Sequence, residues 1–492
     1  MTATLTLPLA VAPLGTLSMT PDEFRTAGHA LVDWIADYRG RLAAGEFPVQ
    51  SPVAPGAIYA QLAAAPPSTP EPAEAIFADF RQLLLPGITH WQHPSFFGYF
   101  PANSALASVL GDLLSSGLGV IGLNWQSSPA LTEVETMTIR WMRDLVGLSG
   151  RWTGALQDTA STASLVALIC ARERSTGYGG ARGGLQSAPS PLVVYASEQA
   201  HSSVEKAAVL AGFGREHIRA VATDEDFALS VPALERAIAA DRARGLTPCA
   251  IVATTGTTGT TAMDPIGAIA SVARRERLWL HVDSAMAGAA MLLPECRSYW
   301  EGIEDADSII VNAHKWLGAV FDCTLYFVRD QEHLIRVMST NPSYLQSAVD
   351  GEVINYRDWG IPLGRRFRAL KLWFLLRAEG TDRLRARLRR DLANAQWLAE
   401  EVRRTPGWRV VAPVKLQTVC VRFEPVGIEP DALDAYTQAW SARVNASGAA
   451  YLTPAKVAGR WMVRVSIGAE PTERAHVEAL WLTMQRTVAG GP

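Results

Sequence analysis

The sequence predicts an α/β protein in which helices cover both faces of a mostly parallel central sheet. Short apolar runs recur between about residues 155 and 330, and their apolarity is continuous, which indicates strands buried on both sides. Stretches with helical periodicity lie between several of these runs, in the order that a parallel sheet requires. The chain has 492 residues, so two or three domains are expected.

Residues 1–105 are expected to form an N-terminal helical segment. Thr20 can cap a helix, Pro21 suits its first turn, and Glu23 completes a capping box. A proline-rich connection follows at 63–75. The pattern therefore predicts a first helix that begins at about Pro21.

Residues 106–377 are expected to form a large α/β domain, which opens with two apolar helices at 106–122 and 130–147. The predicted strands are PLVVYAS (191–197), CAIVATT (249–255), LWLHVDS (278–284), SIIVNA (308–313) and TLYFVR (324–329). Residues 378–492 begin with a long arginine-rich amphipathic helix and continue with the strand-like runs TVCVRFEP and RWMVRVSIG and a last helix. This last part predicts a small α+β domain.

Charge and cysteine usage exclude several classes of function. A net charge of −3 provides no basic face for nucleic acid and no polybasic membrane contact. The five cysteines are far apart and lack a metal-binding spacing, which favours a reducing cytoplasm. The apolar residues 1–18 lack a basic region and contain Pro8 and Pro13, so they do not resemble a signal peptide. We expect a cytoplasmic protein with no nucleic acid, membrane or metal partner.

Polar residues follow the predicted strands at the ends where ligands bind in open α/β sheets. They are Ser197 and His201, Thr254 and Thr255, Asp283 and Ser284, and Asn312 to Lys315. Lys315 stands out because almost every other basic position is arginine. A neutral amine can form a Schiff base with an aldehyde, which a guanidinium cannot do. The alternative is a strand-end lysine that points to solvent.

Three further features complete a pattern around Lys315. Asp283 ends a buried strand, where it either keeps a pyridine nitrogen protonated or makes an internal ion pair or cap. Thr159, Ala160 and Ser161 begin a helix, as an anion site or as ordinary caps. His201 either lies over a cofactor ring or makes structural hydrogen bonds. Together these features match one cofactor, pyridoxal 5′-phosphate (PLP).

Longer strings identify a family. The strings are NAHKW, HVDSAMAG, QAHSSVEKA, VATTGTT, HPSFFGYFPAN, NWQSSPALTEVE and IPLGRRFRALKLW. They closely resemble the group II PLP-dependent decarboxylases, above all the aromatic-L-amino-acid decarboxylases and their bacterial DOPA-decarboxylase-like members. The resemblance runs in consistent order from about residue 20 to the C-terminus. It implies the PLP-dependent transferase fold type I, similar to that of aspartate aminotransferase, in a homodimer around which the N-terminal segment wraps.

The resemblance also implies roles for single residues. Lys315 would bind the cofactor covalently, Asp283 would pair with its ring nitrogen, and His201 and Ala285 would pack on its two faces. The phosphate would be held by Thr159, Ala160, Ser161, Asn312 and His314, with Thr254 near the ring substituents. Tyr344 would lie in a mobile catalytic loop as the proton donor. The catalytic residues implied by the resemblance are thus Lys315, Tyr344, His201 and Asp283. The alternative for Tyr344 is a loop tyrosine packed against its own domain.

The same resemblance places the substrate among apolar and aromatic side chains. Trp91, Tyr99 and Phe100 would form one side of this pocket, and Ile121 and Leu123 would arrive from the other subunit. A sixth position, Gly364, is a serine in histidine-selective and some tyrosine-selective relatives. Such a lining suits a flat ring and favours DOPA, 5-hydroxytryptophan or tryptophan.

One departure concerns ring hydroxyls. Ala102 replaces a threonine that contacts the catechol in animal enzymes, and Asn103 is a candidate substitute for that hydroxyl. The expected function is decarboxylation of an aromatic L-amino acid to its amine and CO2. The alternatives are an aromatic acetaldehyde synthase, a decarboxylase of a non-aromatic amino acid, or a catalytically silent scaffold or ligand binder.

Overall fold

A computed structural model of the chain describes residues 19–187, 190–340 and 349–489. Its larger sheet has seven strands in the order β1-β7-β6-β5-β4-β2-β3. The strands are β1 (Thr153–Gln157), β2 (Leu192–Ser197), β3 (Ile218–Val221), β4 (Thr247–Thr254), β5 (Trp279–Asp283), β6 (Ser308–Asn312) and β7 (Thr324–Val328). Strands β3, β2, β4, β5 and β6 are parallel neighbours, while β7 is antiparallel to β6 and β1. The predicted mostly parallel sheet is confirmed.

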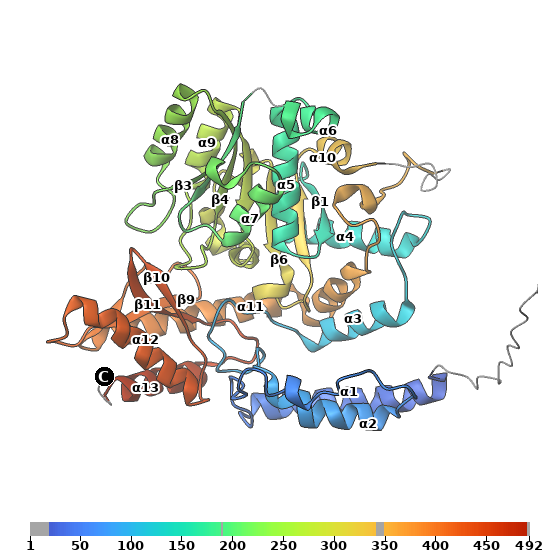
Figure 1. Cartoon of the computed structure of the whole chain (residues 1–492), viewed down its shortest axis with the longest axis vertical. Helices are drawn as coiled ribbons and strands as arrows, with labels where there is room; N and C mark the ends of the chain where they lie inside the picture. Colours follow the sequence, from blue (N-terminus) through green and yellow to red (C-terminus); the bar gives the residue numbers. More distant parts are fainter. Residues whose placement is uncertain (1–18, 188–189, 341–348, 490–492) are drawn as a thin grey trace, which may run out of the picture.

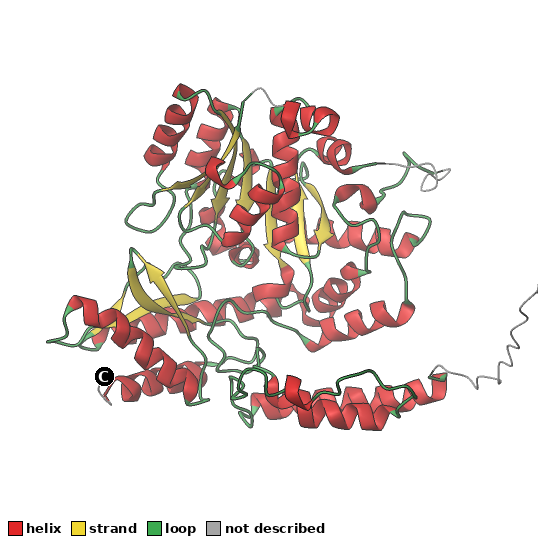
Figure 2. Cartoon of the chain, viewed as in Figure 1, coloured by secondary structure: helices red, strands yellow, loops and turns green. Residues whose placement is uncertain are grey.

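Helices cover both faces of this sheet (Figures 1 and 2). Side chains along β2 alternate between two cores, with Val193 and Tyr195 in one and Val194 and Ala196 in the other. The first core is closed by α4 (Pro129–Leu145), α8 (Val231–Ala243), α9 (Ile266–Glu276) and α11 (Arg368–Arg404). The second is closed by α5 (Ala160–Ser175), α7 (Ser202–Leu210) and α10 (Gln331–Met338). Burial on both faces explains why the strands are continuously apolar.

A second sheet of four strands lies beside the large one and carries the C-terminal part of the chain. Its order is β10-β11-β9-β8, with β8 (Trp408–Val410), β9 (Thr418–Phe423), β10 (Thr453–Val457) and β11 (Arg460–Ser466). Helices α12 (Pro430–Ala446) and α13 (Arg474–Ala489) pack on it. Helix α11 connects the two parts, and Gly380, with φ of 68°, interrupts its helical backbone. The division of the chain at residues 105 and 377 remains a proposal.

The N-terminal helices α1 (Pro21–Ala43) and α2 (Ala73–Asp79) lie side by side along one end of the molecule (Figure 1). Both hydrogen bonds of the capping box between Thr20 and Glu23 are present, as predicted. Trp34 of α1 packs edge-on against Phe77, with ring centroids 5.4 Å apart. Phe24 nevertheless remains 60% exposed. The apolar side of this arm is therefore only partly covered within one chain.

Helix α3 (Leu106–Leu118) crosses α11 and also exposes leucines, including Leu110 and Leu113. Short helical elements complete the fold. They are Tyr59–Gln61, Phe80–Leu84, Leu85–Gly87, Gly179–Gly183 (α6), Leu185–Ser187, Arg215–His217, Ala287–Leu292, Pro294–Trp300, Ile303–Asp305, Ala313–Leu317 and Tyr356–Trp359. None of the helices in the described ranges combines the length and apolarity needed to cross a membrane.

Candidate active site

A cavity of about 260 Å³ lies at the carboxyl ends of β4, β5 and β6. Ten of the residues predicted from the sequence line it: Phe100, Thr159, Ala160, Ser161, His201, Thr254, Asp283, Ala285, Asn312 and Lys315. Four more, which the sequence did not single out, complete the lining: Ser203, Gly256, Thr258 and Met286. The expectation that strand-end polar groups converge at one edge of the sheet therefore holds for this cavity.

Lys315 lies in a short turn, Ala313–Leu317, that follows β6 directly. Its own backbone is not helical (φ −97°, ψ −118°), so the turn is interrupted where the amine enters the cavity. Burial lowers the pKa of this amine, the positive charge of Arg464 lowers it further, and the nearby Asp283 carboxylate opposes both effects. The site therefore shifts the amine toward its neutral, nucleophilic form.

Thr254 and Asp283 are the last register pair of β4 and β5, and both side chains face the cavity. Asp283 is only 5% exposed, and its Oδ1 accepts a hydrogen bond from the Ala285 backbone N–H at 3.0 Å. The hydroxyl of Thr254 is buried and has no hydrogen-bond partner among the described residues. A buried hydroxyl without a partner is costly, so Thr254 is suited to a ligand that supplies one.

The first turn of α5 faces the same cavity. Thr159 is the N-cap, and its hydroxyl accepts a hydrogen bond from the Thr162 N–H. The amides of Ala160 and Ser161 belong to the helix start, where N–H groups have no partner within the helix. Asn312 accepts a hydrogen bond from the Thr324 hydroxyl through Oδ1, which leaves its NH2 group to donate. These donors suit a phosphate group.

His201 makes a structural hydrogen bond, and its position over a cofactor ring stays a prediction. Its Nδ1 caps α7 by accepting a hydrogen bond from the Ser203 N–H at 3.1 Å, and its ring lines the cavity. Burial lowers the pKa of the imidazole, and the positive charge of Lys315 lowers it further against the opposing effect of Asp283. A neutral ring whose Nδ1 accepts a hydrogen bond carries its proton on Nε2.

Several expected site residues are not on the cavity wall. His314 is buried behind it, where Nδ1 accepts a hydrogen bond from the Cys323 N–H and burial lowers its pKa to about 4. Trp91 and Tyr99 stack on each other at 5.4 Å, next to Phe100 in the chain. Tyr344 lies outside the described residues.

Gly364 lies with Ile121 and Leu123 in a separate cluster. A Cβ atom at Gly364 would come within 3.4 Å of Ile121 Cγ2 and 3.9 Å of Leu123 Cδ2. Backbone hydrogen bonds in both directions between Gly122 and Arg365 hold the two segments together. None of these three residues lines the cavity of its own chain.

Asn103 does not replace the missing threonine hydroxyl, contrary to one expectation. Its Nδ2 donates to the Gly468 carbonyl at 2.7 Å, and its Oδ1 accepts from the Glu470 N–H at 2.8 Å. The side chain is 2% exposed and is thus committed to joining the C-terminal part to the rest of the chain.

Arg464, on β11 of the small sheet, is a functional candidate that sequence analysis missed. It is buried, its guanidinium lies 4.8 Å from the centroid of the Phe100 ring, and it lowers the pKa of Lys315. Its Nε donates to the Gly259 carbonyl at 3.1 Å, while its Nη2 has no partner in the described parts of the chain. The only signal in the sequence is an arginine inside a predicted buried strand.

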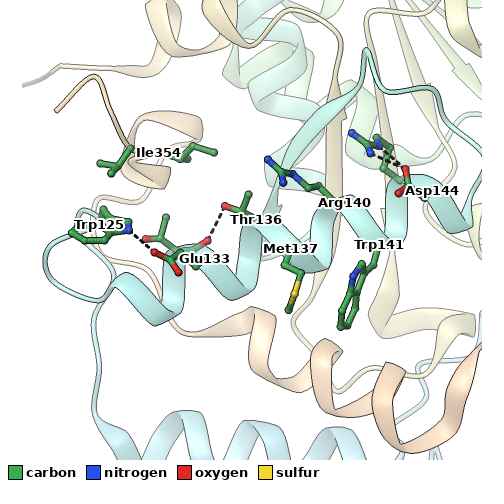
Figure 3. A pocket seen from close by; sticks show the side chains of 11 residues that line it. Trp125, Glu133, Thr136, Met137, Arg140, Trp141, Asp144 and Ile354 are labelled. Atoms are coloured by element: carbon green, nitrogen blue, oxygen red, sulfur yellow. Dashed lines mark hydrogen bonds and ion pairs between the residues drawn. The ribbon is translucent and has the colours of Figure 1, made fainter. Parts of the chain in front are cut away.

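A larger groove of about 620 Å³ runs along α4 beside residues 353–354 (Figure 3). None of the described residues that line it is a lysine or a histidine. Its carboxylates are engaged, with Glu133 accepting from Trp125 Nε1 and Asp144 paired with Arg143. The groove therefore lacks the nucleophile and the proton carriers that the smaller cavity contains.

The smaller cavity fits PLP on its own chemistry. It offers a buried lysine with a lowered pKa, a carboxylate, a helix start and a threonine hydroxyl that lacks a partner. These groups would suit the aldehyde, ring nitrogen, phosphate and ring substituents of the cofactor. No group of three His, Cys, Asp or Glu residues in the described chain could hold a metal ion.

Comparison with known proteins decides the family. The conserved domain of the pyridoxal-dependent decarboxylases matches residues 55–424. The chain belongs to this family. It is therefore a PLP-dependent carboxy-lyase, and its fold is that of the PLP-dependent decarboxylases, as predicted.

Similar proteins match almost the whole length of this decarboxylase. Phenylacetaldehyde synthase of Arabidopsis thaliana is 39% identical over 95% of this chain and 96% of its own length. Tyrosine decarboxylase of Papaver somniferum is 38% identical over 95% and 94%. The solved structure of the TDC of Oryza sativa, with PLP and tryptamine, superposes with a TM-score of 0.92 and 35% identity, covering 97% of this chain and 99% of that one.

Proposed function

We propose that this decarboxylase converts aromatic L-amino acids, with DOPA, 5-hydroxytryptophan and tryptophan favoured, to the corresponding amines and CO2. The observation that carries the proposal is the aromatic ring of Phe100, which lines the cavity with its centroid 5.6 Å from the Lys315 amine. A flat apolar wall stabilises a ring by burial and stacking. Similar proteins named for tyrosine and tryptophan decarboxylation support the same substrate class.

The residues of the cavity have distinct tasks. When bound, PLP supplies a protonated ring that accepts the electrons left behind as CO2 departs. Lys315, whose pKa is lowered, would supply the amine that bonds to the cofactor, and Asp283 would keep the proton on its ring nitrogen. His201 would pack against the ring and, with Phe100, would help to exclude water. The start of α5 binds the phosphate through its free amides.

Tyr344 is proposed as the acid that protonates the substrate Cα after CO2 leaves, since a tyrosine with its ordinary pKa near 10 is protonated at pH 7. Without that proton, reaction with O2 and water would give aldehyde, ammonia and hydrogen peroxide instead of amine. Tyr344→Phe is therefore expected to lose amine and to form these three products in equal amounts. Unchanged amine output would contradict the role of Tyr344.

We also propose that the decarboxylase works as a homodimer in the cytoplasm. Ile121, Leu123 and Gly364 lie apart from their own cavity, and Ile121 is 60% exposed, so they are available to a second copy. Leu110 and Leu113 extend the exposed apolar surface along α3. All five cysteines are buried free thiols, which fits a reducing compartment. Analytical ultracentrifugation of the holoenzyme tests the dimer directly.

Two measurements test the proposed function. The first is kcat/KM for DOPA, 5-hydroxytryptophan, tryptophan, tyrosine, phenylalanine and glutamate, with amine and aldehyde quantified separately. Preference for glutamate, or aldehyde as the main product, would overturn the proposal. The second is mass spectrometry after borohydride reduction, which is expected to find the pyridoxyl group on Lys315. Lys315→Arg should abolish the adduct and the activity, while the matched variant Lys456→Arg, at an exposed lysine, should retain both.

A further inference from the structure

Three buried side chains form a closed hydrogen-bonded ring directly behind the active site. The indole Nε1 of Trp300 donates to Thr255 Oγ1 at 3.0 Å and to Ser284 Oγ at 2.9 Å. The two hydroxyl groups are also hydrogen-bonded to each other. Trp300 is 2% exposed, and neither hydroxyl residue is more than 1% exposed. Water therefore does not replace any of these bonds, and the three groups depend on one another.

The ring occupies the reverse side of the strand ends that carry Thr254 and Asp283. Successive side chains of a strand point to opposite sides, so Thr255 and Ser284 point away from the cavity that their neighbours line. The sequence grouped all four as strand-end polar residues. The structure separates them into a pair that faces the cavity and a pair that faces Trp300.

The backbone of Asp283 is held from the same side. The Thr255 N–H donates to the Asp283 carbonyl at 2.9 Å. The ends of β4 and β5 are therefore joined twice, by this backbone hydrogen bond and by the side-chain ring of Thr255, Ser284 and Trp300. The carboxylate itself accepts a hydrogen bond from the Ala285 N–H, two residues further on. Its direction therefore follows the backbone of residues 283–285, and Ser284 is the middle residue of that segment. A displacement of Ser284 would turn the carboxylate.

We propose that Trp300 is a positioning residue that fixes the Asp283 carboxylate against the cofactor ring nitrogen through the hydroxyls of Thr255 and Ser284. The inference rests on the proposed role of Asp283. Catalytic groups need their geometry held within about 0.5 Å, which packing alone achieves less well than packing with directional bonds. Trp300 supplies both, because its ring belongs to the large core and its N–H bridges two strands.

The test uses the holoenzyme loaded with PLP that carries ¹⁵N in its ring. Trp300→Phe removes the N–H and keeps an aromatic ring in the core. Ser284→Ala removes one acceptor and keeps the indole, so it is the variant to measure if Trp300→Phe does not fold. The control is Trp440→Phe in the small-sheet core, where the indole is also buried but its N–H has no hydrogen-bond partner among the described residues.

Trp300→Phe and Ser284→Ala are expected to shift the ¹⁵N resonance, to raise the dissociation constant of PLP about fivefold and to lower kcat about fivefold, with KM within about twofold. Fivefold is the change in an equilibrium or rate constant that corresponds to about 1 kcal/mol, the order of the net contribution of a neutral hydrogen bond. Trp440→Phe is expected to leave all of these values unchanged. If Trp300→Phe left the resonance where Trp440→Phe leaves it, Trp300 would be a packing residue only.

Asp283→Asn separates failure of this inference from failure of the proposed function. That variant should move the ¹⁵N resonance further than Trp300→Phe does, because it acts at the ring nitrogen itself. If Asp283→Asn left the ¹⁵N resonance unchanged, the proposed role of Asp283 would be refuted, and the inference about Trp300 with it. A resonance that responds to Asp283→Asn but not to Trp300→Phe or Ser284→Ala would overturn the inference alone.

Discussion

Thr254→Val should stabilise the cofactor-free enzyme and weaken its hold on PLP. The Thr254 hydroxyl is buried at the cavity and has no partner among the described residues. A buried hydroxyl in that condition costs about 1–3 kcal/mol. Valine has nearly the same shape without the hydroxyl, so the free energy of unfolding of the apoenzyme should rise by about 1 kcal/mol or more.

Binding of PLP should respond in the opposite direction, because Thr254→Val is expected to weaken it. Where the hydroxyl hydrogen-bonds to a ring substituent of PLP, its loss removes about 1 kcal/mol of binding, which raises the dissociation constant about fivefold. Chemical denaturation of the apoenzyme measures the first effect. Titration of the apoenzyme with PLP, followed by absorbance, measures the second.

Thr255→Val is the matched control, since Thr255 is the next residue and is equally buried. Its hydroxyl has two partners, Trp300 and Ser284, so the same substitution should destabilise the apoenzyme by about 1–3 kcal/mol. Equal changes in the two variants would refute the reasoning. So would a Thr254→Val enzyme that binds PLP as tightly as the original.

Three further predictions concern buried charges. Burial lowers the pKa of His281 from 6.5 to about 4. As pH falls below 6.5, the unfolded chain therefore binds a proton at this residue that the folded chain does not bind, and the free energy of unfolding decreases. Between pH 6.5 and 5 the loss is about 2 kcal/mol, which His281→Gln should remove in urea titrations at the two pH values. Glu135→Ala should cost about 3–5 kcal/mol in urea unfolding, because it leaves the buried Arg365 without its carboxylate. Arg464→Gln should raise the pKa of Lys315 and move PLP capture by the apoenzyme to higher pH.

Each of these predictions has a control. For His281→Gln the control is the original enzyme in urea titrations at the same two pH values. Glu400, which pairs with Arg404 at the surface, should tolerate alanine with little loss of stability. An Arg464→Lys enzyme keeps the positive charge and should retain the original pH dependence, so equal behaviour of Arg464→Gln and Arg464→Lys would contradict the electrostatic explanation.

Sequence patterns predicted the central strands of the large sheet but not its two edges. Strands β2, β4, β5, β6 and β7 were found because their runs are continuously apolar, while β1 and β3 are short edge strands. Of the small domain, β9 and β11 were found, whereas β8 and β10 lie at the edges of their sheet. Strands β3, β8 and β10 are less buried and so carry weaker patterns, while β1 is buried but its sequence, TGALQ, has few β-branched or aromatic residues.

The site was predictable where its residues follow strands and not where they come from distant segments. Lys315, Asp283 and Thr254 each come at or just after the end of a strand, so topology brings them together. Arg464 comes from the other sheet and packs against Phe100, one of the residues that line the cavity. Trp300 contacts the ends of β4 and β5 on the side away from the cavity, which no sequence pattern distinguishes. Asn103 was misjudged because its partners, Gly468 and Glu470, lie more than 360 positions away in the chain.

The place of Arg464 on β11 has a consequence for shortened forms of this chain. A form that ended before residue 464 would keep every side chain that lines the cavity, together with all seven strands of the large sheet. Its lysine, however, would lose a positive neighbour and become more basic. A search for the lysine and aspartate motifs would still recognise such a fragment, although its amine would be a poorer nucleophile at neutral pH.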